Sequence, residues 1–238
     1  MKKKIVLITG TTSGIGEELR LLYNKNNYKT ISVNRIDSKK NESRNNISYY
    51  IDITSQLDID NLIEDIKKNN IQPDIYIFNA GVNKPDFENI FRKKIFEEVL
   101  NINFFSINLF LESIKKYDLK NKVFIFISSF STIFPNKNNV SYYFSKYLIN
   151  RLYQSQNWID KNNLYKIVYL GPVKTNIKRH IKDEKKLNRF FFNLLSINKS
   201  YVAKKIFNFS LNSKKRIIIP YRVFLFYTLI KLLAFFRL

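Results

Sequence analysis

The hydrophobic and polar positions of this chain alternate between short, β-branched apolar runs and longer amphipathic stretches. The amphipathic stretches predict helices, because their apolar residues recur at helical spacing; Ile59, Leu62, Ile63 and Ile66 follow i, i+3, i+4, i+7. We expect helices at residues 17–24, 59–66, 90–117 and 140–161, the third broken near its start. The apolar runs predict strands at residues 5–9, 30–33, 48–51, 75–78, 123–128, 165–170 and 216–220.

Strands that alternate with helices predict a parallel sheet with right-handed crossovers and helices on both faces. A chain of 238 residues is long enough for one such domain and short for two. We therefore predict an α/β fold, a Rossmann-like doubly wound parallel sheet in three α/β/α layers, as a single domain at residues 1–220. In such sheets, ligands bind beyond the carboxyl ends of the strands. The candidate functional residues fall at those strand ends.

The composition removes several kinds of chemistry. The chain has no Cys and one His, His180, which excludes disulfides, thiolate catalysis and zinc sites built from Cys or clustered His. Its 41 Lys and Arg against 19 Asp and Glu give a net charge of +22. Such a charge suits an anionic partner, but the basic residues form no single stripe and no nucleic-acid-binding motif is present. We expect no nucleic-acid partner and interpret the charge as a compositional bias.

A glycine-rich turn follows the first predicted strand and leads into the first helix. Glycines allow a tight turn and close approach to a pyrophosphate, which the free N–H groups of a helix N-terminus attract. No Lys follows the last glycine, so the turn does not match an ATP-binding P-loop. The turn predicts a dinucleotide site with contacts at Gly10, Thr12, Ser13, Gly14, Ile15 and Gly16.

The end of the second predicted strand indicates which dinucleotide binds. Dinucleotide folds often carry an acidic residue there to bind the ribose diol, whereas this chain reads Val33-Asn34-Arg35. The guanidinium fork of Arg35 suits a 2′-phosphate. The sequence therefore favours NADP over NAD, with Arg35 as a solvated loop residue as the alternative.

A tyrosine and a lysine open the helix after the fifth predicted strand. Tyr142 and Lys146 are four residues apart and share a helix face. A phenol with a pKa near 10 is a poor base at neutral pH, and we expect the nearby ammonium to lower that pKa. Ser129 ends the fifth strand and could donate a hydrogen bond to a substrate oxygen. Together, these side chains predict proton-transfer chemistry.

These motifs resemble the short-chain dehydrogenase/reductase family in its compact single-domain form, from about Lys4 to Thr175. The resemblance implies that Asp52 contacts the adenine, that the Asn-Ala-Gly motif shapes the cofactor pocket, and that the segment after Gly171 holds the nicotinamide end. The further cofactor-binding residues that it implies are Asp52, Ile53, Asn79, Ala80, Gly81, Tyr142, Lys146, Pro172, Val173 and Thr175.

The resemblance also implies a mechanism and a substrate class. Ser129 and Tyr142 would polarise a small carbonyl compound, the nicotinamide would deliver hydride, and Tyr142 would donate the proton. Lys146 would bind the nicotinamide ribose, and Asn103 would hold a water that returns the proton, with Asn101 as a competitor for that role. The expected activity is an NADP-dependent oxidoreductase that interconverts a carbonyl and an alcohol. The alternatives are a non-catalytic dinucleotide sensor on the same fold and a sugar-nucleotide-modifying enzyme.

Two further segments suggest partners. Residues 221–238 are apolar nearly all round, which predicts a C-terminal helix that contacts a membrane surface or a lipid-linked substrate; the alternatives are packing on a partner subunit and a plain terminal helix. Residues 177–199 carry many Lys and Arg where the family places a loop over the substrate, which suits an anionic substrate or an acidic carrier protein as well as it suits the compositional bias. We expect a cytoplasmic homodimer or homotetramer, with peripheral membrane contact through the tail.

Overall fold

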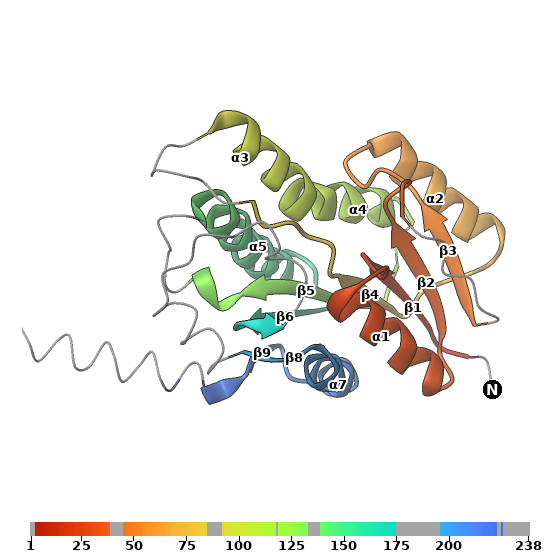
Figure 1. The fold of residues 1–238 in the computed structure, drawn as a ribbon. Helices are drawn as coiled ribbons and strands as arrows, with labels where there is room; N and C mark the ends of the chain where they lie inside the picture. Colours follow the sequence, from red (N-terminus) through yellow and green to blue (C-terminus); the bar gives the residue numbers. More distant parts are fainter. Residues whose placement is uncertain are drawn as a thin grey trace, which may run out of the picture.

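The computed structural model describes residues 3–38, 45–84, 92–117, 119–132, 139–174, 196–222 and 225. Within these residues, seven strands form one parallel sheet in the order β3-β2-β1-β4-β5-β6-β9 (Figure 1). The strands are β1 (Ile5–Thr9), β2 (Lys29–Asn34), β3 (Asn46–Tyr50), β4 (Ile75–Phe78), β5 (Val123–Ser129), β6 (Leu164–Leu170) and β9 (Arg216–Ile219). The predicted doubly wound α/β fold is confirmed.

Helices cover both faces of the sheet (Figure 1). The helices and short helical turns are α1 (Gly14–Lys25), α2 (Gln56–Lys68), α3 (Lys93–Leu100), η2 (Asn101–Phe105), α4 (Ser106–Lys115), η3 (Phe130–Thr132), α5 (Val140–Ile159) and α7 (Lys199–Ser210). One core cluster joins α2, α4 and α5 to one sheet face, and a second joins α1 and α7 to the other. The result is the predicted three-layer arrangement.

Burial on both faces explains why the strands read as continuous apolar runs. In β1, Leu7 packs into the core beneath α2 and α4, while Val6 and Ile8 pack into the core beneath α1 and α7. All three residues have no exposed area. Strands covered by helices on both sides need apolar residues at every position, since neighbouring side chains point to opposite faces.

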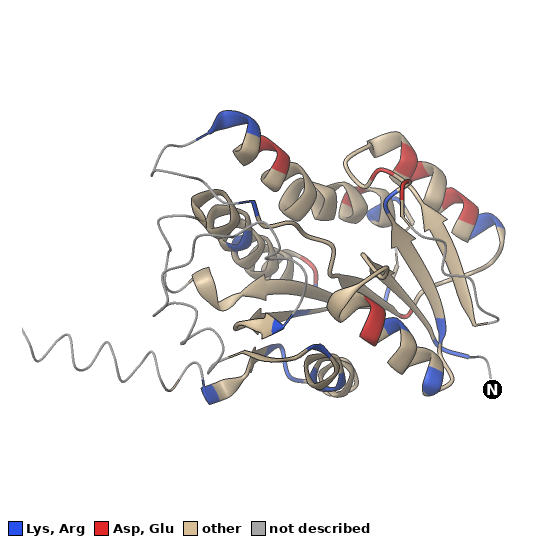
Figure 2. Cartoon of the chain, in the orientation of Figure 1, with Lys and Arg blue, Asp and Glu red and all other residues tan. Residues whose placement is uncertain are grey.

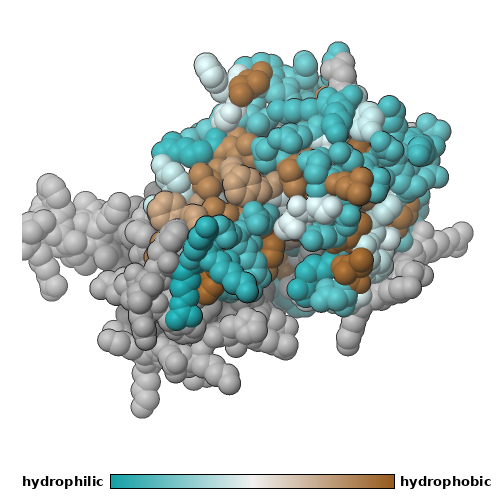
Figure 3. Space-filling model, turned by 90° about the horizontal axis from the view of Figure 1, so that it is seen from above, coloured by the Kyte–Doolittle hydropathy of each residue, from teal (hydrophilic) through white to brown (hydrophobic). Residues whose placement is uncertain are grey.

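The long helical region expected at residues 90–117 is divided. Five residues, Asn101–Phe105, form a π-helical segment between α3 and α4. Ile107 and Phe110 are buried against the sheet, and Phe105 is 46% exposed. Viewed from above, patches of apolar surface interrupt the hydrophilic covering of the described residues (Figure 3).

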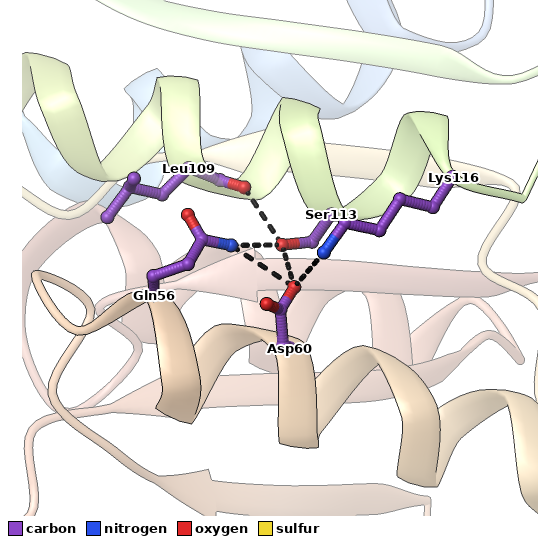
Figure 4. Close-up of polar contacts among 5 residues, drawn as sticks. All are labelled: Gln56, Asp60, Leu109, Ser113 and Lys116. Atoms are coloured by element: carbon purple, nitrogen blue, oxygen red, sulfur yellow. Dashed lines mark hydrogen bonds and ion pairs between the residues drawn. The ribbon is translucent and has the colours of Figure 1, made fainter.

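A polar cluster fastens α2 to α4 on this side of the sheet (Figure 4). The Asp60 carboxylate accepts hydrogen bonds from the Ser113 hydroxyl at 2.6 Å and from the Lys116 ammonium at 2.9 Å. Gln56 donates to both Asp60 and Ser113. These bonds, first that of Ser113, lower the pKa of Asp60, so the carboxylate stays ionised and the two helices stay joined at neutral pH.

Helix α7 and the short strands β7 and β8 were not predicted from the sequence. Strand β7 (Val173–Lys174) pairs with β8 (Ile197–Asn198), which leads directly into α7. Lys166 lies fully buried in β6, and its ammonium donates to the carbonyl oxygens of Phe209 and Asn212 at the end of α7. Burial lowers the pKa of Lys166 to about 8. A lysine inside a strand therefore acts as a helix cap, which its position in the sequence does not reveal.

The predicted charge distribution and tail can be compared with the described residues only in part. Figure 2 shows Lys and Arg scattered over several helices and loops of the described chain, without a single basic face. None of the helices in this part of the chain has the length and apolar character needed to cross a membrane. His180, most of the basic segment 177–199 and most of the tail 221–238 lie outside the described residues.

Candidate active site

A cavity of about 950 Å³ lies at the carboxyl ends of the central strands. Its walls come from the turn after β1, the ends of β2 and β4, and the first turns of α5. The predicted cofactor residues that line it are Gly10, Thr12, Ser13, Gly14, Ile15, Arg35, Asp52, Ile53, Asn79, Ala80, Gly81, Tyr142 and Lys146. Residues from distant parts of the sequence thus meet at the edge where parallel sheets bind ligands.

The glycines of the turn after β1 serve two different purposes. Gly10 and Gly14 have φ values of 73° and 65°, a left-handed conformation that side chains other than glycine rarely adopt. Gly16 does not line the cavity, but a Cβ there would lie 2.0 Å from the Gly10 carbonyl oxygen. Gly16 therefore lets α1 approach the turn, which directs the free N–H groups of its first turn toward the cavity.

Asn79 ties the end of β4 to the end of β1. Its side-chain amide donates to the carbonyl oxygens of Thr9 and Gly10, both at 3.0 Å. The Thr9 hydroxyl accepts from the backbone N–H groups of Asn79 and Ala80, also at 3.0 Å. The Asn-Ala-Gly segment therefore fixes the shape of the cavity through backbone contacts.

The end of β2 presents an amide and a guanidinium to the cavity. The side-chain oxygen of Asn34 accepts from the backbone N–H of Thr11 at 2.8 Å and from its hydroxyl at 3.1 Å. Asn34 borders the cavity, but its Nδ2 is sealed from the surface and has no hydrogen-bond partner among the described residues. Arg35 is exposed and forms an ion pair with Asp37 at 3.5 Å. Arg35 was predicted from the sequence as a cavity residue and its neighbour Asn34 was not.

The segment after β3 forms a tight polar turn beside the cavity. The Asp52 carboxylate accepts from the backbone N–H of Thr54 at 2.8 Å and from its hydroxyl at 2.7 Å. The backbone N–H of Asp52 donates to Asp58 at 3.0 Å. Ile53 is buried and contributes an apolar surface to the same wall. This combination of one carboxylate and one aliphatic side chain suits a flat heterocycle with polar edges.

Tyr142 and Lys146 line the cavity, and Ser129 lies next to Tyr142 without being among the lining residues. The Tyr142 side chain is hydrogen-bonded to the Ser129 side chain. The Ser129 hydroxyl oxygen also accepts from the backbone N–H of Ser131 at 3.1 Å. The Lys146 ammonium lies 5.6 Å from the centre of the Tyr142 ring and donates to the Ile127 carbonyl oxygen at 2.9 Å. A hydroxyl, a phenol and an ammonium therefore lie close together beside the cavity.

The pKa of Tyr142 differs from the expectation. Burial raises this pKa above its usual value, and the hydrogen bond with Ser129 only partly offsets the effect. Burial also lowers the pKa of Lys146 to about 8. The expected lowering of the Tyr142 pKa by the ammonium was wrong for the protein without ligand, because desolvation disfavours both charged forms. In this state, the phenol is firmly protonated.

Asn103 lies in the π-helical segment and has no exposed area. Its side chain donates to the Val82 carbonyl oxygen and to the Ser145 hydroxyl, both at 2.9 Å, and accepts from the Val82 N–H at 2.8 Å. The Ser145 hydroxyl donates to the Tyr142 carbonyl oxygen at 2.7 Å. Asn103 thus connects the wall after β4 to the turn that carries Tyr142, whereas Asn101 is exposed and lines the cavity. The role of Asn103 in a water relay stays a prediction.

The segment after β6 lies behind the cavity. Gly171 donates to the Ile219 carbonyl oxygen at 2.8 Å, and the Pro172 carbonyl oxygen accepts from Ile197 at 3.1 Å. Pro172 and Val173 are not among the described residues that line the cavity, and Thr175 lies outside the described residues. Their predicted contacts with a cofactor remain predictions.

The residues directly after the Asn-Ala-Gly motif also line the cavity, although they were not predicted from the sequence. Asn83 lines the cavity and is 8% exposed, and its side-chain oxygen has no hydrogen-bond partner. The next residue, Lys84, forms an ion pair with Glu98 of α3, and both also line the cavity. The position of Asn83 and Lys84 in the sequence could have identified them, since polar residues that follow the end of a strand lie at the ligand-binding edge of a parallel sheet.

Comparisons with known proteins agree with this geometry. A family model described as short chain dehydrogenase matches residues 4–186, whereas no curated protein matches the sequence significantly. Among solved structures, ElxO with NADP bound has a TM-score of 0.79 at 21% identity, over 92% of this chain and 97% of that chain. A short chain dehydrogenase family protein from Francisella tularensis subsp. tularensis SCHU S4 has a TM-score of 0.76 at 22% identity, with the same coverage. A short chain dehydrogenase from Burkholderia cenocepacia J2315 in complex with NADP has a TM-score of 0.72 at 16% identity, over 91% and 88%.

Proposed function

Because this chain belongs to the short-chain dehydrogenase family, with a match across residues 4–186, we propose that it is an NADP-dependent oxidoreductase that interconverts a carbonyl and an alcohol. Members of the family are generally oxidoreductases, and two similar structures were solved with NADP. The observation that carries the proposal is the hydrogen bond between Ser129 and Tyr142, where Tyr142 and the nearby Lys146 line the large cavity.

The described residues fit a nicotinamide dinucleotide. The first turn of α1 would hold the pyrophosphate, since its N–H groups have no partners within the helix. The guanidinium of Arg35, at the end of β2, would hold the 2′-phosphate of the ribose. Asp52 and Ile53 would border the adenine. When bound, the nicotinamide supplies or accepts the hydride.

The side chains of the chain itself handle the oxygen and its proton. In the reducing direction, the hydroxyl groups of Ser129 and Tyr142 donate hydrogen bonds to the substrate oxygen and stabilise the negative charge that develops on it. The raised pKa of Tyr142 keeps the phenol protonated and ready to act as the general acid. The ammonium of Lys146 then stabilises the phenolate that remains after the proton has moved.

A panel of carbonyl compounds tests the proposed reaction directly. Aldehydes, ketones, carrier-linked 3-oxoacyl compounds and sugar phosphates would each be mixed with NADPH and the protein, and the absorbance of the reduced nicotinamide would be followed. We expect oxidation of NADPH with at least one class and formation of the matching alcohol. NADPH binding without turnover of any carbonyl, or of the matching alcohols with NADP⁺, would instead favour a non-catalytic dinucleotide sensor.

Arg35→Gln should change the choice of cofactor. We expect the KM for NADPH to rise about tenfold, because a hydrogen-bonded charge on the 2′-phosphate is lost. The KM for NADH should change little, since NADH has no group at that position. Asp37→Asn is the matched control; it frees Arg35 from its ion pair at 3.5 Å and should lower the KM for NADPH. Equal changes for both cofactors in Arg35→Gln would contradict the assignment.

Activity should fall as the pH rises through about 8. The pKa of Lys146 is lowered by burial to about 8, so its ammonium is present below that pH and lost above it. The value of kcat/KM for NADPH, measured at saturating carbonyl compound, reports the ionisation of the free enzyme and should decline across this range. Lys146→Arg keeps its charge, so the decline should move to higher pH even though activity is lower. If kcat/KM of the Lys146→Arg variant still fell near pH 8, the ionisation responsible would belong to a residue other than Lys146.

A further inference from the structure

A second cavity, of about 350 Å³, lies at the amino end of β4, whereas the active site lies at the carboxyl ends of the strands. It is bordered by the end of α2, the start of β4 and the end of α4. Strand β4 connects the two cavities, with Tyr76 at this one and Asn79, just beyond its end, at the active site. A ligand held here would therefore leave the dinucleotide site open.

Part of the wall of this cavity is aliphatic and belongs to the packed core. Ile63, Ile66 and Ile114 line it, and each is no more than 6% exposed. These residues also belong to the cluster that joins α2 and α4 to the sheet. Rigid apolar walls around a space of this size are typical of a small-molecule site.

The cavity contains a buried hydroxyl that the protein does not use. Tyr76 is 2% exposed, and its ring stacks on Phe124 with the centres 4.9 Å apart. Its hydroxyl has no hydrogen-bond partner among the described residues. The hydroxyl oxygen is also not among the buried polar atoms that are sealed from the surface. Because Tyr76 lines this cavity, the hydroxyl opens onto it. Burial and the nearby Asp74 raise the pKa of Tyr76, which keeps the hydroxyl neutral. A buried hydroxyl without a partner can bind a neutral polar group of a ligand.

The rim carries a cation with no acidic partner. The Lys67 ammonium lies over the Tyr117 ring, 4.2 Å from its centre, and no carboxylate of the described residues is within ion-pair distance of it. The other rim lysine, Lys116, is already paired with Asp60 at 2.9 Å (Figure 4). An anionic group at the mouth of the cavity would therefore meet Lys67.

We propose that this cavity binds a small hydroxyaryl carboxylate. The ring lies between the isoleucine side chains, the hydroxyl group bonds to the Tyr76 hydroxyl, and the carboxylate contacts Lys67 at the rim. A ligand with an apolar ring and no charge would make no ion pair with Lys67. A ligand that placed its carboxylate beside Tyr76 would bring it near the Asp74 carboxylate, and the two negative charges would repel each other.

Ligand-observed NMR and calorimetry with the full chain test this proposal, using 3-(4-hydroxyphenyl)propionate as the probe. The comparison ligands are 3-phenylpropionate, which lacks the hydroxyl group, and tyramine, which replaces the carboxylate with an ammonium. We expect saturable binding of the probe, about fivefold weaker binding of the phenyl analogue and no saturable binding of tyramine. Binding should persist with NADP(H) at saturation.

Two variants and a control decide which atoms hold the probe. Tyr76→Phe should remove the difference between the probe and its phenyl analogue, because both then lack a partner for the hydroxyl group. Lys67→Gln should weaken both carboxylates about threefold, as expected for an exposed ion pair. The control is Lys68→Gln, because Lys68 is 78% exposed, pairs with Glu64 and does not line the cavity. It should leave all affinities unchanged.

The proposal fails if the probe does not bind saturably, if NADP(H) displaces it, or if Lys67→Gln and Lys68→Gln have the same effect. Lys67 is exposed, so Lys67→Gln should fold even if Tyr76→Phe does not, and a thermal unfolding curve for each variant checks this. None of these measurements depends on turnover, so their outcome is separate from that of the proposed oxidoreductase activity.

Discussion

Tyr142→Phe should lower kcat by about 10³-fold and leave the affinity for NADPH within about twofold. The substitution removes one oxygen atom, and with it the proton donor and the hydrogen bond to Ser129. The phenyl ring keeps its place on the first turn of α5, so the walls of the cavity do not change. An effect confined to kcat is the result expected when a general acid is removed and ligand binding is kept.

The chain provides a matched control in the next residue. Tyr143 lies on the same helix turn and stacks on Tyr147, with the ring centres 6.1 Å apart. It does not line the cavity in the described residues. Tyr143→Phe should therefore keep full activity. Single-turnover kinetics and NADPH fluorescence titrations on both variants separate chemistry from binding, and an active Tyr142→Phe enzyme would rule out the proposed mechanism.

The fold could be predicted from the sequence because its determinants are local and repeated. In β1 and β4, β-branched and aromatic residues form runs that the helices cover on both sides, and both predicted strands match the observed limits. The spacing of Ile59, Leu62 and Ile66 fixed the buried face of α2 in the same way. A periodic pattern indicates which side of a helix or strand faces the core. This was sufficient to predict a sheet between two layers of helices.

The parts that escaped prediction depend on contacts between distant residues. Lys166 caps α7 across 43 residues of sequence, and a lysine in a strand otherwise predicts an exposed position. The pKa of Tyr142 was predicted in the wrong direction because burial, which the sequence does not report, outweighs the spacing to Lys146. Asn34 and Asn83 border the cavity only because the fold brings the ends of β2 and β4 to the same edge of the sheet.

Gly16→Ala should damage the protein more than any other single methyl group added at a described glycine. A Cβ at Gly16 would lie 2.0 Å from the Gly10 carbonyl oxygen and 2.6 Å from the Asn79 side-chain amide. Neither atom can yield easily, because the first belongs to the backbone of the turn and the second holds β4 to β1. We expect the free energy of unfolding to fall by about 3 kcal/mol. The affinity for NADP should fall about 100-fold, since α1 must move away from the turn.

Gly81→Ala is the comparison that separates backbone crowding from the mere addition of a methyl group. At Gly81, the nearest atoms are the side-chain oxygen of Asn103 at 3.1 Å and the ammonium of Lys146 at 3.5 Å. Side-chain atoms adjust more readily than a backbone carbonyl, so the loss of stability should be below about 1 kcal/mol. Denaturant unfolding without cofactor measures both variants on one scale. If Gly16→Ala were as stable as Gly81→Ala, α1 could move away from the turn without cost. The close contact between Gly16 of α1 and the Gly10 carbonyl oxygen would then not be what holds the phosphate-binding turn in shape.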